Sequence, residues 1–392
     1  MKNILKYKKE LFSLFSVILF FLIVRKGKER YIFDIFFMIS TLFLIKKKDI
    51  KLDKYFIFSL LGYIITISFN FFYTRIVGVE EFLDYIIYSY ITFLILSQIE
   101  LKEKIYKNFL FIFSIFTLIF TLKSINIWYE VGFKAGYRNY EQGIPTITSI
   151  EVGVYTLMCF ISSIYSKGIF KKVISFGCFL VSVLSLISIN SRNSLMIIPI
   201  IIFGIIIVKY YNKIKLKYLG VILLIIAISF HQIQKTNIEK YFYRIERTLN
   251  IENLKKEARI EIWKNGIEKF KENNYKSLGY KYFEKNKINN NHPHLHNIFL
   301  EILVTQGWLS LIFYILFNIF LLKEMIKKIK ITEIESQKIM NYLTISILIF
   351  YNLSGLVDAN IYFKKVNLLV YFLYALALCS VEKEEKNNLI VK

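Results

Sequence analysis

The arrangement of the apolar residues constrains this chain more than any other feature of its sequence. Long apolar runs alternate with short lysine-rich stretches along most of the 392 residues. A helix needs roughly 20 apolar residues to cross the hydrocarbon core of a bilayer, which is about 30 Å thick. Runs near that length recur too often for the core helices of a soluble protein, and 55% of all residues are hydrophobic, with a mean hydropathy of +0.47. The sequence therefore predicts an all-α, polytopic membrane protein.

About twelve transmembrane helices are predicted from these runs. Several runs are shorter than a full span, and we expect their ends to extend into flanking aromatic and lysine residues that reach the membrane interface. The expected spans are Leu11–Val24, Tyr31–Ile45, Tyr55–Tyr73, Phe82–Ser97, Phe109–Leu122, Ile150–Tyr165, Val173–Ile189, Leu195–Val208, Tyr218–Phe230, Ile298–Leu322, Ile339–Leu356 and Val366–Val381.

Lysine and arginine are concentrated in alternate connecting segments, which predicts that both termini lie in the cytoplasm. The clusters at Lys46–Lys48, Lys171-Lys172 and Lys209–Lys217 all fall on the inner side, while the basic Arg25–Arg30 turn is the exception. The same turn follows the first apolar run where a signal peptide would have a small-residue cleavage site. We therefore interpret that run as the first membrane helix.

Three parts follow from this topology. Residues 1–231 are expected to form membrane helices 1–9, and residues 297–392 to form helices 10–12 and a cytoplasmic tail. Between them, residues 232–296 form a long extracytoplasmic loop with helix-like stretches at Ile238–Leu249 and Ile251–Lys271. A loop of this length with its own secondary structure is usually functional.

Charge and cysteine content exclude several classes of function. The formal net charge of +23 could suit nucleic acid, but the lysines stand between apolar runs, where they flank membrane helices, so no nucleic-acid partner is expected. The cysteines Cys159, Cys178 and Cys379 all lie inside apolar runs, which favours buried small side chains over a disulfide or zinc site. No phosphate-binding loop is present, and no cofactor is expected.

Arg192 stands in a polar Ser-Arg-Asn-Ser turn between two expected spans, at the outer face. It is the only charged residue between Lys172 and Lys209. An arginine here could simply extend to the lipid interface. It could also bind phosphate, because guanidinium stays charged and bonds phosphate in a bidentate manner.

A second arginine lies in the long loop. Arg259 and Trp263 are four residues apart and would share one face of a helix. The simple interpretation is an exposed arginine beside a packing tryptophan. The functional one is a second cation that, with Arg192, would suit a diphosphate.

Three of the four histidines, His292, His294 and His296, fall within five residues, directly before the span that carries Glu301. A structural cluster is one possibility, and a metal site is another. We do not expect a metal, because no aspartate or cysteine close to the histidines in the sequence completes a metal site. Acid–base chemistry by a histidine is favoured, since imidazole titrates near neutral pH, and His296 at the membrane boundary is the preferred residue.

Taken in order, these motifs resemble the O-antigen ligase family and its polymerase relatives. The resemblance is carried by the arginine in the outer turn at Ser191–Ser194, R-x-x-x-W-x-x-G at Arg259–Gly266, Leu-Gly-Tyr at Leu278–Tyr280, and H-x-H-N-x-x-L-E-x-L-x-x-x-G at His294–Gly307. It covers about Ser191–Leu322, and each short motif is weak without the others.

The resemblance implies a GT-C-like glycosyltransferase in the bacterial inner (cytoplasmic) membrane, with its active site facing the periplasm. The donor would be a glycan on polyprenyl (undecaprenyl) diphosphate, and the acceptor a sugar hydroxyl such as that of lipid A–core, with inversion and without metal. The implied catalytic residues are His296, Arg192 and Arg259, the two arginines on the donor diphosphate. The implied substrate-binding residues are Arg138, His294, Asn297, Glu301 and Trp263.

Other functions remain open at this point. A polymerase that joins lipid-linked repeat units of O-antigen or capsule would use the same donor class, and sequence separates it poorly from a ligase. A glycan-lipid flippase belongs to another class and would show polar residues deep in several spans. Charges inside the expected spans are sparse, with Asp34 and Glu301 the clearest, and the titratable cluster lies in one outer loop, which disfavours the flippase. A purely structural membrane protein is the least favoured alternative.

Overall fold

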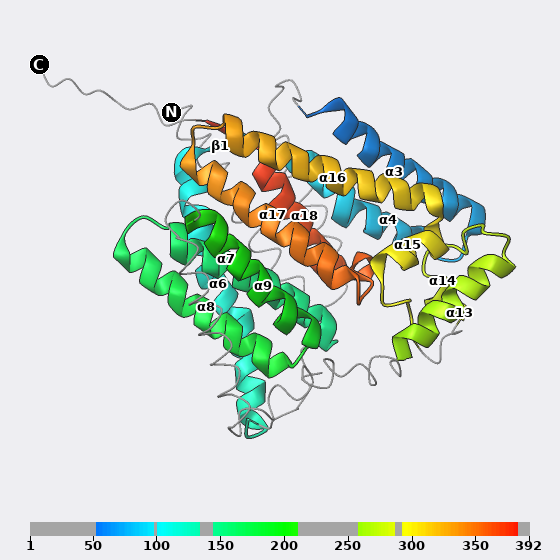
Figure 1. Cartoon of the computed structure of the whole chain (residues 1–392), viewed down its shortest axis with the longest axis horizontal. Helices are drawn as coiled ribbons and strands as arrows, with labels where there is room; N and C mark the ends of the chain where they lie inside the picture. The colour runs from blue at the N-terminus through cyan, green and yellow to red at the C-terminus, as the bar shows by residue number, and fades with distance from the viewer. Residues whose placement is uncertain (1–51, 98–99, 134–143, 211–257, 287–291, 383–392) are drawn as a thin grey trace, which may run out of the picture.

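The computed structural model describes residues 52–97, 100–133, 144–210, 258–286 and 292–382, and it is almost entirely helical over them (Figure 1). The elements are α3 (Lys54–Thr74), α4 (Val79–Ile86), the π-helix η1 (Ile87–Ile91), α5 (Thr92–Ser97), β1 (Glu100–Lys102), α6 (Glu103–Glu130), α7 (Pro145–Tyr165), α8 (Ile169–Ile189), α9 (Arg192–Tyr210), α13 (Ala258–Glu272), α14 (Tyr282–Asn286), α15 (Ile298–Gln306), α16 (Trp308–Ile331), α17 (Glu335–Gly355), the 3₁₀-helix η2 (Asn360–Tyr362), α18 (Lys364–Leu378) and β2 (Ser380–Glu382). The two short strands pair in parallel, with Glu100 opposite Ser380.

Within these described residues, 6 helices are long and apolar enough to cross a membrane: α3, α6 from Asn108 onward, α7, α8, α9 and α16. They confirm the membrane class and, apart from α16, the spans expected at those places. The spans Leu11–Val24, Tyr31–Ile45 and Tyr218–Phe230 lie outside the described residues, as do Asp34 and the stretch Ile238–Leu249. The total of about twelve spans, and the sidedness of the loop, therefore remain predictions.

Two expected spans differ from the structure. The expected helix Ile298–Leu322 is wrong as one element, because it is broken at Gly307 into α15 and α16. Gly307 has a φ of +94°, which glycine adopts readily and other residues rarely do. The expected helix Phe82–Ser97 is continuous from Val79 to Ser97, but it contains the π-helical turn η1 between α4 and α5.

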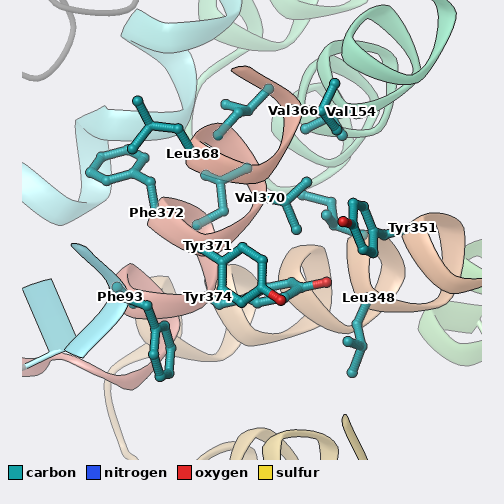
Figure 2. Packing of buried hydrophobic residues seen from close by; sticks show 14 of the residues in the cluster. Phe93, Val154, Leu348, Tyr351, Val366, Leu368, Val370, Tyr371, Phe372 and Tyr374 are labelled. Carbon is teal, nitrogen blue, oxygen red and sulfur yellow. The ribbon is translucent and has the colours of Figure 1, made fainter. Parts of the chain in front are cut away.

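The core of the bundle surrounds α18. All residues from Val366 to Leu378 are buried, and α18 packs against α17, α5, η1 and α7. Figure 2 shows this packing, with Tyr371 and Tyr374 of α18 facing Phe93 and Leu348 of neighbouring helices. A helix that is apolar all round belongs in the middle of a bundle.

The periphery of the bundle is apolar on its outer surface as well. Helices α3 and α16 lie side by side along one edge (Figure 1). On α3, Phe56 and Leu60 are buried, whereas Phe58, Ile65 and Phe69 are exposed. Exposed rows of this kind suit contact with lipid chains, where an apolar surface costs nothing.

A smaller core lies at one end of the bundle, apart from the α18 core. It is formed by α13, α14, the histidine loop (residues 292–297) and α15, which together we name the cap. Its buried side chains include Ile262, Phe270, Leu295 and Val304. The helix expected at Ile251–Lys271 is present as α13 from Ala258 onward, while its earlier residues lie outside the described chain.

Candidate functional site

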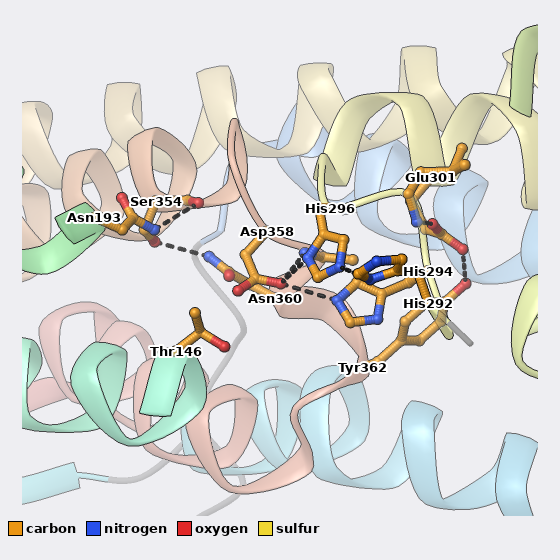
Figure 3. A network of polar contacts seen from close by, with 12 residues as sticks. Thr146, Asn193, His292, His294, His296, Glu301, Ser354, Asp358, Asn360 and Tyr362 are labelled. Carbon is orange, nitrogen blue, oxygen red and sulfur yellow. Dashed lines mark hydrogen bonds and ion pairs between the residues drawn. The ribbon is translucent and has the colours of Figure 1, made fainter. Parts of the chain in front are cut away.

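A buried aspartate joins the histidine loop to the bundle. His294 Nε2 lies 2.9 Å from Asp358 Oδ1, and His296 Nδ1 lies 3.4 Å from the same oxygen. Asp358 stands in the turn between α17 and η2 and is 1% exposed. The imidazole of His292 extends this group, and its Nδ1 lies 3.3 Å from His296 Nε2 (Figure 3). One carboxylate thus orients two imidazoles that the sequence motif already placed together.

The electrostatics of this group favour an ionised aspartate and a neutral histidine. Burial by itself would raise the pKa of Asp358, but the hydrogen bond from His294 and the nearby His296 ring hold it well below its usual range. Burial lowers the pKa of His296, and the charges of His294 and Arg259 lower it further, against the opposing effect of Asp358. A neutral His296 can accept a proton, and the carboxylate can stabilise the imidazolium that results.

The same three residues could also hold a cation. One ligand atom from each of His294, His296 and Asp358 lies within 4.8 Å of the others, and imidazole and carboxylate are ordinary zinc ligands. The sequence argument against a metal assumed that no aspartate lies near the histidines, and that assumption is wrong. The expectation of a metal-independent site therefore rests on the family resemblance alone.

The start of α15 fixes the conformation of the histidine loop. Asn297 caps the helix, since its Oδ1 accepts from Phe299 N and Leu300 N at 3.0 Å each, while its Nδ2 donates to Leu356 O at 3.0 Å. His296 has a φ of +52°, a strained conformation that costs about 1–3 kcal/mol and often marks functional sites. The hydrogen bonds of Asn297 therefore hold His296, the preferred catalytic residue, in this strained conformation.

Glu301, the acidic residue of the motif, is fully buried beneath the loop. Its Oε2 accepts from Leu295 N at 2.6 Å, and its Oε1 accepts from the Tyr362 hydroxyl at 2.6 Å. Both oxygens are therefore bonded within the protein. The visible part played by Glu301 is to tie the histidine loop to η2, and its expected contact with substrate stays a prediction.

Helix α13 lies against the other side of the loop. Trp263 Nε1 donates to Leu295 O at 2.7 Å, and a Cβ added at Gly266 would come within 2.6 Å of Leu295 Cδ2. The tryptophan and glycine of the R-x-x-x-W-x-x-G motif thus seat the helix on the loop. One turn before Trp263, Arg259 lies close enough for its charge to lower the pKa of His296. The second arginine therefore belongs to the same neighbourhood as the histidines.

Arg192 is the first residue of α9, and its neighbour Asn193 bonds to the bundle. Asn193 Nδ2 donates to Ser354 O at 3.0 Å, and the Ser354 hydroxyl accepts from Asn360 Nδ2 at 2.8 Å. Ser194 is fully buried and donates to Ser149 O on α7 at 3.0 Å. These bonds fix the first turn of α9 on the segment that also carries Asp358.

Segment 354–360 is the point where the separate motifs meet. It contacts the first turn of α9 through Ser354, and the histidine loop through Leu356 and Asp358 (Figure 3). Three buried polar atoms in this region have no hydrogen-bond partner among the described residues: Asn193 Oδ1, Asp358 Oδ2 and Asn360 Oδ1. Unsatisfied buried groups are costly and call for a bound molecule or water. Arg138 lies outside the described residues, so its place in the site stays a prediction.

Ser354, Asp358 and Asn360 were not among the residues that the sequence singled out. A signal for Asp358 was present, because an ionisable residue at the outer end of a membrane span is a functional candidate by default. The polar stretch around Asp358 separates two apolar runs in the sequence. It was missed because it lies far along the chain from the histidines and outside the motifs of the resemblance.

Comparison with known families agrees with this geometry. Residues 177–315 match the O-Antigen ligase family, a segment that begins within α8 and ends within α16. It includes Arg192, Arg259 and the histidine loop, whereas Asp358 lies beyond it. The match confirms the resemblance to the O-antigen ligase and polymerase superfamily over these residues and supports a membrane function of that type. No curated protein matches the chain.

Proposed function

We propose that this chain, in which residues 177–315 match the O-Antigen ligase family, transfers a glycan from a polyprenyl diphosphate carrier to a sugar hydroxyl. The observation that carries the proposal is that two motifs from different parts of the chain, the first turn of α9 and the histidine loop, contact segment 354–360, while α13 packs against the histidine loop. The first turn of α9 brings Arg192, α13 brings Arg259, and the histidine loop brings His296.

The two arginines supply positive charge for the diphosphate leaving group. When the acceptor oxygen attacks the anomeric carbon, the bond from that carbon to the carrier diphosphate breaks and negative charge builds on the departing oxygen. Fixed positive groups aimed at such a charge lower the barrier. Arg192 stands at the N-terminus of a 19-residue helix, where unpaired backbone N–H groups and the helix dipole also favour a phosphate.

The histidines supply the base that takes the proton from the acceptor hydroxyl. The hydroxyl proton passes to the imidazole of His296, which is neutral because burial lowers its pKa. Asp358 orients His294 and His296 and stabilises the imidazolium that forms. A single displacement of this kind inverts the anomeric carbon and needs no nucleotide, since the carrier already activates the sugar.

Deleting the gene and examining the surface polysaccharide tests this proposal. Accumulation of unligated lipid-linked polymer supports a ligase, and single capped repeats support a polymerase with the same donor. Repeats trapped on the inner leaflet would instead indicate a flippase and overturn the transferase proposal. Complementation with His296→Ala or Arg192→Ala should fail although the protein inserts normally, whereas Lys338→Ala, on the distant start of α17, should restore the wild-type polysaccharide.

A further inference from the structure

His292 is the one histidine of the histidine loop to which the proposed chemistry gives no part. Its imidazole lies against that of His296, with the ring centroids 5.3 Å apart and the ring planes at 77°. Its Nδ1 is 3.3 Å from His296 Nε2 (Figure 3), and within the described part of the chain this is the hydrogen bond that the His292 side chain makes. Any function of His292 therefore acts through this contact.

The contact falls on the nitrogen that the proposed reaction uses. His296 Nδ1 lies 3.4 Å from the Asp358 carboxylate, which only accepts hydrogen bonds, so Nδ1 carries the proton of neutral His296. The lone pair that takes the proton from an acceptor hydroxyl is then on Nε2. His292 Nδ1 donates to that lone pair, so a neighbour from the same loop occupies the base in this structure.

His296 is held in place, whereas His292 can turn away. His296 is fixed by the capping bonds of Asn297 and by the ring of His294, whose centroid is 4.2 Å from its own. His292 is partly exposed, and its contact of 3.3 Å is long for a hydrogen bond. Exposed side chains change rotamer quickly, within nanoseconds. A ligand can therefore take the place of His292 without moving His296.

Water is the competitor that this arrangement excludes. The His296 side chain is 18% exposed, so solvent reaches it. A water molecule at Nε2 would attack the anomeric carbon in place of the sugar hydroxyl, and the glycan would be lost from its carrier. Enzymes prevent such side reactions by keeping water from the reacting centre. A single water gains little by displacing a tethered ring, whereas an acceptor sugar can use binding energy from its contacts elsewhere.

We propose that His292 is a guard for the catalytic base, which reserves His296 for the acceptor sugar and keeps it from water. The inference rests on the proposed function and adds to it the selection of a sugar hydroxyl over water. When the acceptor binds, His292 turns away and the sugar hydroxyl takes its place at Nε2. The hydroxyl proton goes to Nε2, its oxygen bonds to the anomeric carbon, and the bond to the carrier diphosphate breaks. With water in that place, the same step yields free glycan and carrier diphosphate.

The test measures release of free glycan, without acceptor, by the full-length protein in nanodiscs. The probe is lipid-linked glycan extracted from cells in which the gene is deleted. His292→Ala uncovers Nε2, and hydrolysis should rise about tenfold or more, because a positioned base contributes about 10²- to 10⁴-fold to such a step. His292→Asn is the matched control, since its amide nitrogen is attached to Cγ as Nδ1 is and still donates to Nε2. It should hydrolyse the donor at the wild-type rate.

A second variant and a second measurement cover the case in which alanine disturbs the loop. His292→Ser also fails to reach His296, and the same rise in hydrolysis is expected from it. Diethyl pyrocarbonate modifies accessible, unbonded imidazole nitrogens, and mass spectrometry gives its rate at His296 without any substrate. That rate should rise severalfold in His292→Ala and His292→Ser, and stay at the wild-type value in His292→Asn.

The guard and the proposed function fail in different ways. If the wild type transfers glycan but neither His292→Ala nor His292→Ser hydrolyses the donor faster, the guard is overturned and the proposed function stands. Unchanged modification of His296 in these two variants would also overturn the guard. Loss of transfer in His292→Asn would make His292 a proton relay instead. Absence of transfer in the wild type would remove the proposed function, and the guard with it.

Discussion

The bundle core around α18 and the contact between the bundle and the cap are both buried, but their chemistry differs. Around α18, residues such as Val370 and Leu373 are fully buried among other apolar and aromatic side chains. At the contact between the bundle and the cap, Asp358, Asn360 and Glu301 are equally buried but are polar. Apolar packing is non-directional and tolerates substitution of similar volume. A buried polar group instead depends on each of its partners, because leaving one unpaired costs the full desolvation penalty. We therefore expect the first region to govern stability and the second to govern chemistry.

The largest effect is expected for Asp358→Asn. This change keeps the shape of the side chain but removes the charge that orients His294 and stabilises protonated His296. Glycan transfer should fall about 10²- to 10⁴-fold, the usual contribution of acid–base catalysis. Initial rates with purified protein measure it. Asp53→Asn, which changes the N-cap residue of α3, is the matched control and should retain its rate. A wild-type rate in Asp358→Asn would contradict the role given to this carboxylate.

The bundle core should respond in the opposite way. Leu373→Ala removes a fully buried side chain of α18 and should lower the free energy of unfolding by about 2–5 kcal/mol. Transfer per folded molecule should stay near the wild-type value. Thermal unfolding in lipid, with the rate normalised to folded protein, separates the two quantities. Leu184→Ala on the exposed face of α8 should change neither. If Leu373→Ala instead lost transfer at full stability, the division between the two regions would be wrong.

Inside the cap, the contact between α13 and the histidine loop can be weakened by removing one hydrogen bond. Trp263→Phe keeps most of the packing but removes the bond from Nε1 to Leu295 O, which is worth about 1 kcal/mol. Hydrogen exchange in the histidine loop should therefore rise about fivefold, with little change in the exchange of α18. Trp128→Phe, on α6, is the matched control. Unchanged exchange in the loop would show that Trp263 does not hold it.

A smaller effect is expected in the pH profile. The pKa of His296 lies below its ordinary value, chiefly through burial, so the neutral base persists below the usual range and activity should fall only as the pH drops through that lowered pKa. Arg259 is a minor contributor to the shift, and removing its charge raises the pKa. The acid limb of kcat/KM should therefore move to slightly higher pH in Arg259→Gln, and remain in place in Lys264→Gln on the same helix. A limb that moves to lower pH would contradict the proximity of Arg259 to His296.

Removal of divalent metal ions is expected to have no effect on glycan transfer. If His294, His296 and Asp358 act as a hydrogen-bonded group, dialysis against EDTA should leave transfer unchanged. Loss of transfer that zinc or another divalent cation restores would show that these residues hold a metal, and it would move the polar region from acid–base to metal-assisted chemistry.

The sequence by itself determined the membrane class and most of the described helices, because a bilayer demands long apolar segments whose backbone bonds are satisfied locally. The sequence also singled out Arg259, Trp263 and His296. These residues stand in short motifs, close to the glycines and the helix-capping residue that fix the local backbone. The break at Gly307 was missed because the apolar run continues through it without any change in hydropathy, and only the backbone φ distinguishes the two helices.

The part played by Asp358 was decided by tertiary structure. Its distance from His294 along the chain is 64 residues, and hydropathy carries no information on which outer turn meets which loop. Only the packing of α17 and the following turn against α15 and the histidine loop brings the carboxylate under the histidines. Apolar burial is additive along a sequence and can be inferred from it, whereas a buried polar contact depends on two groups meeting in one geometry, which the folded chain alone supplies.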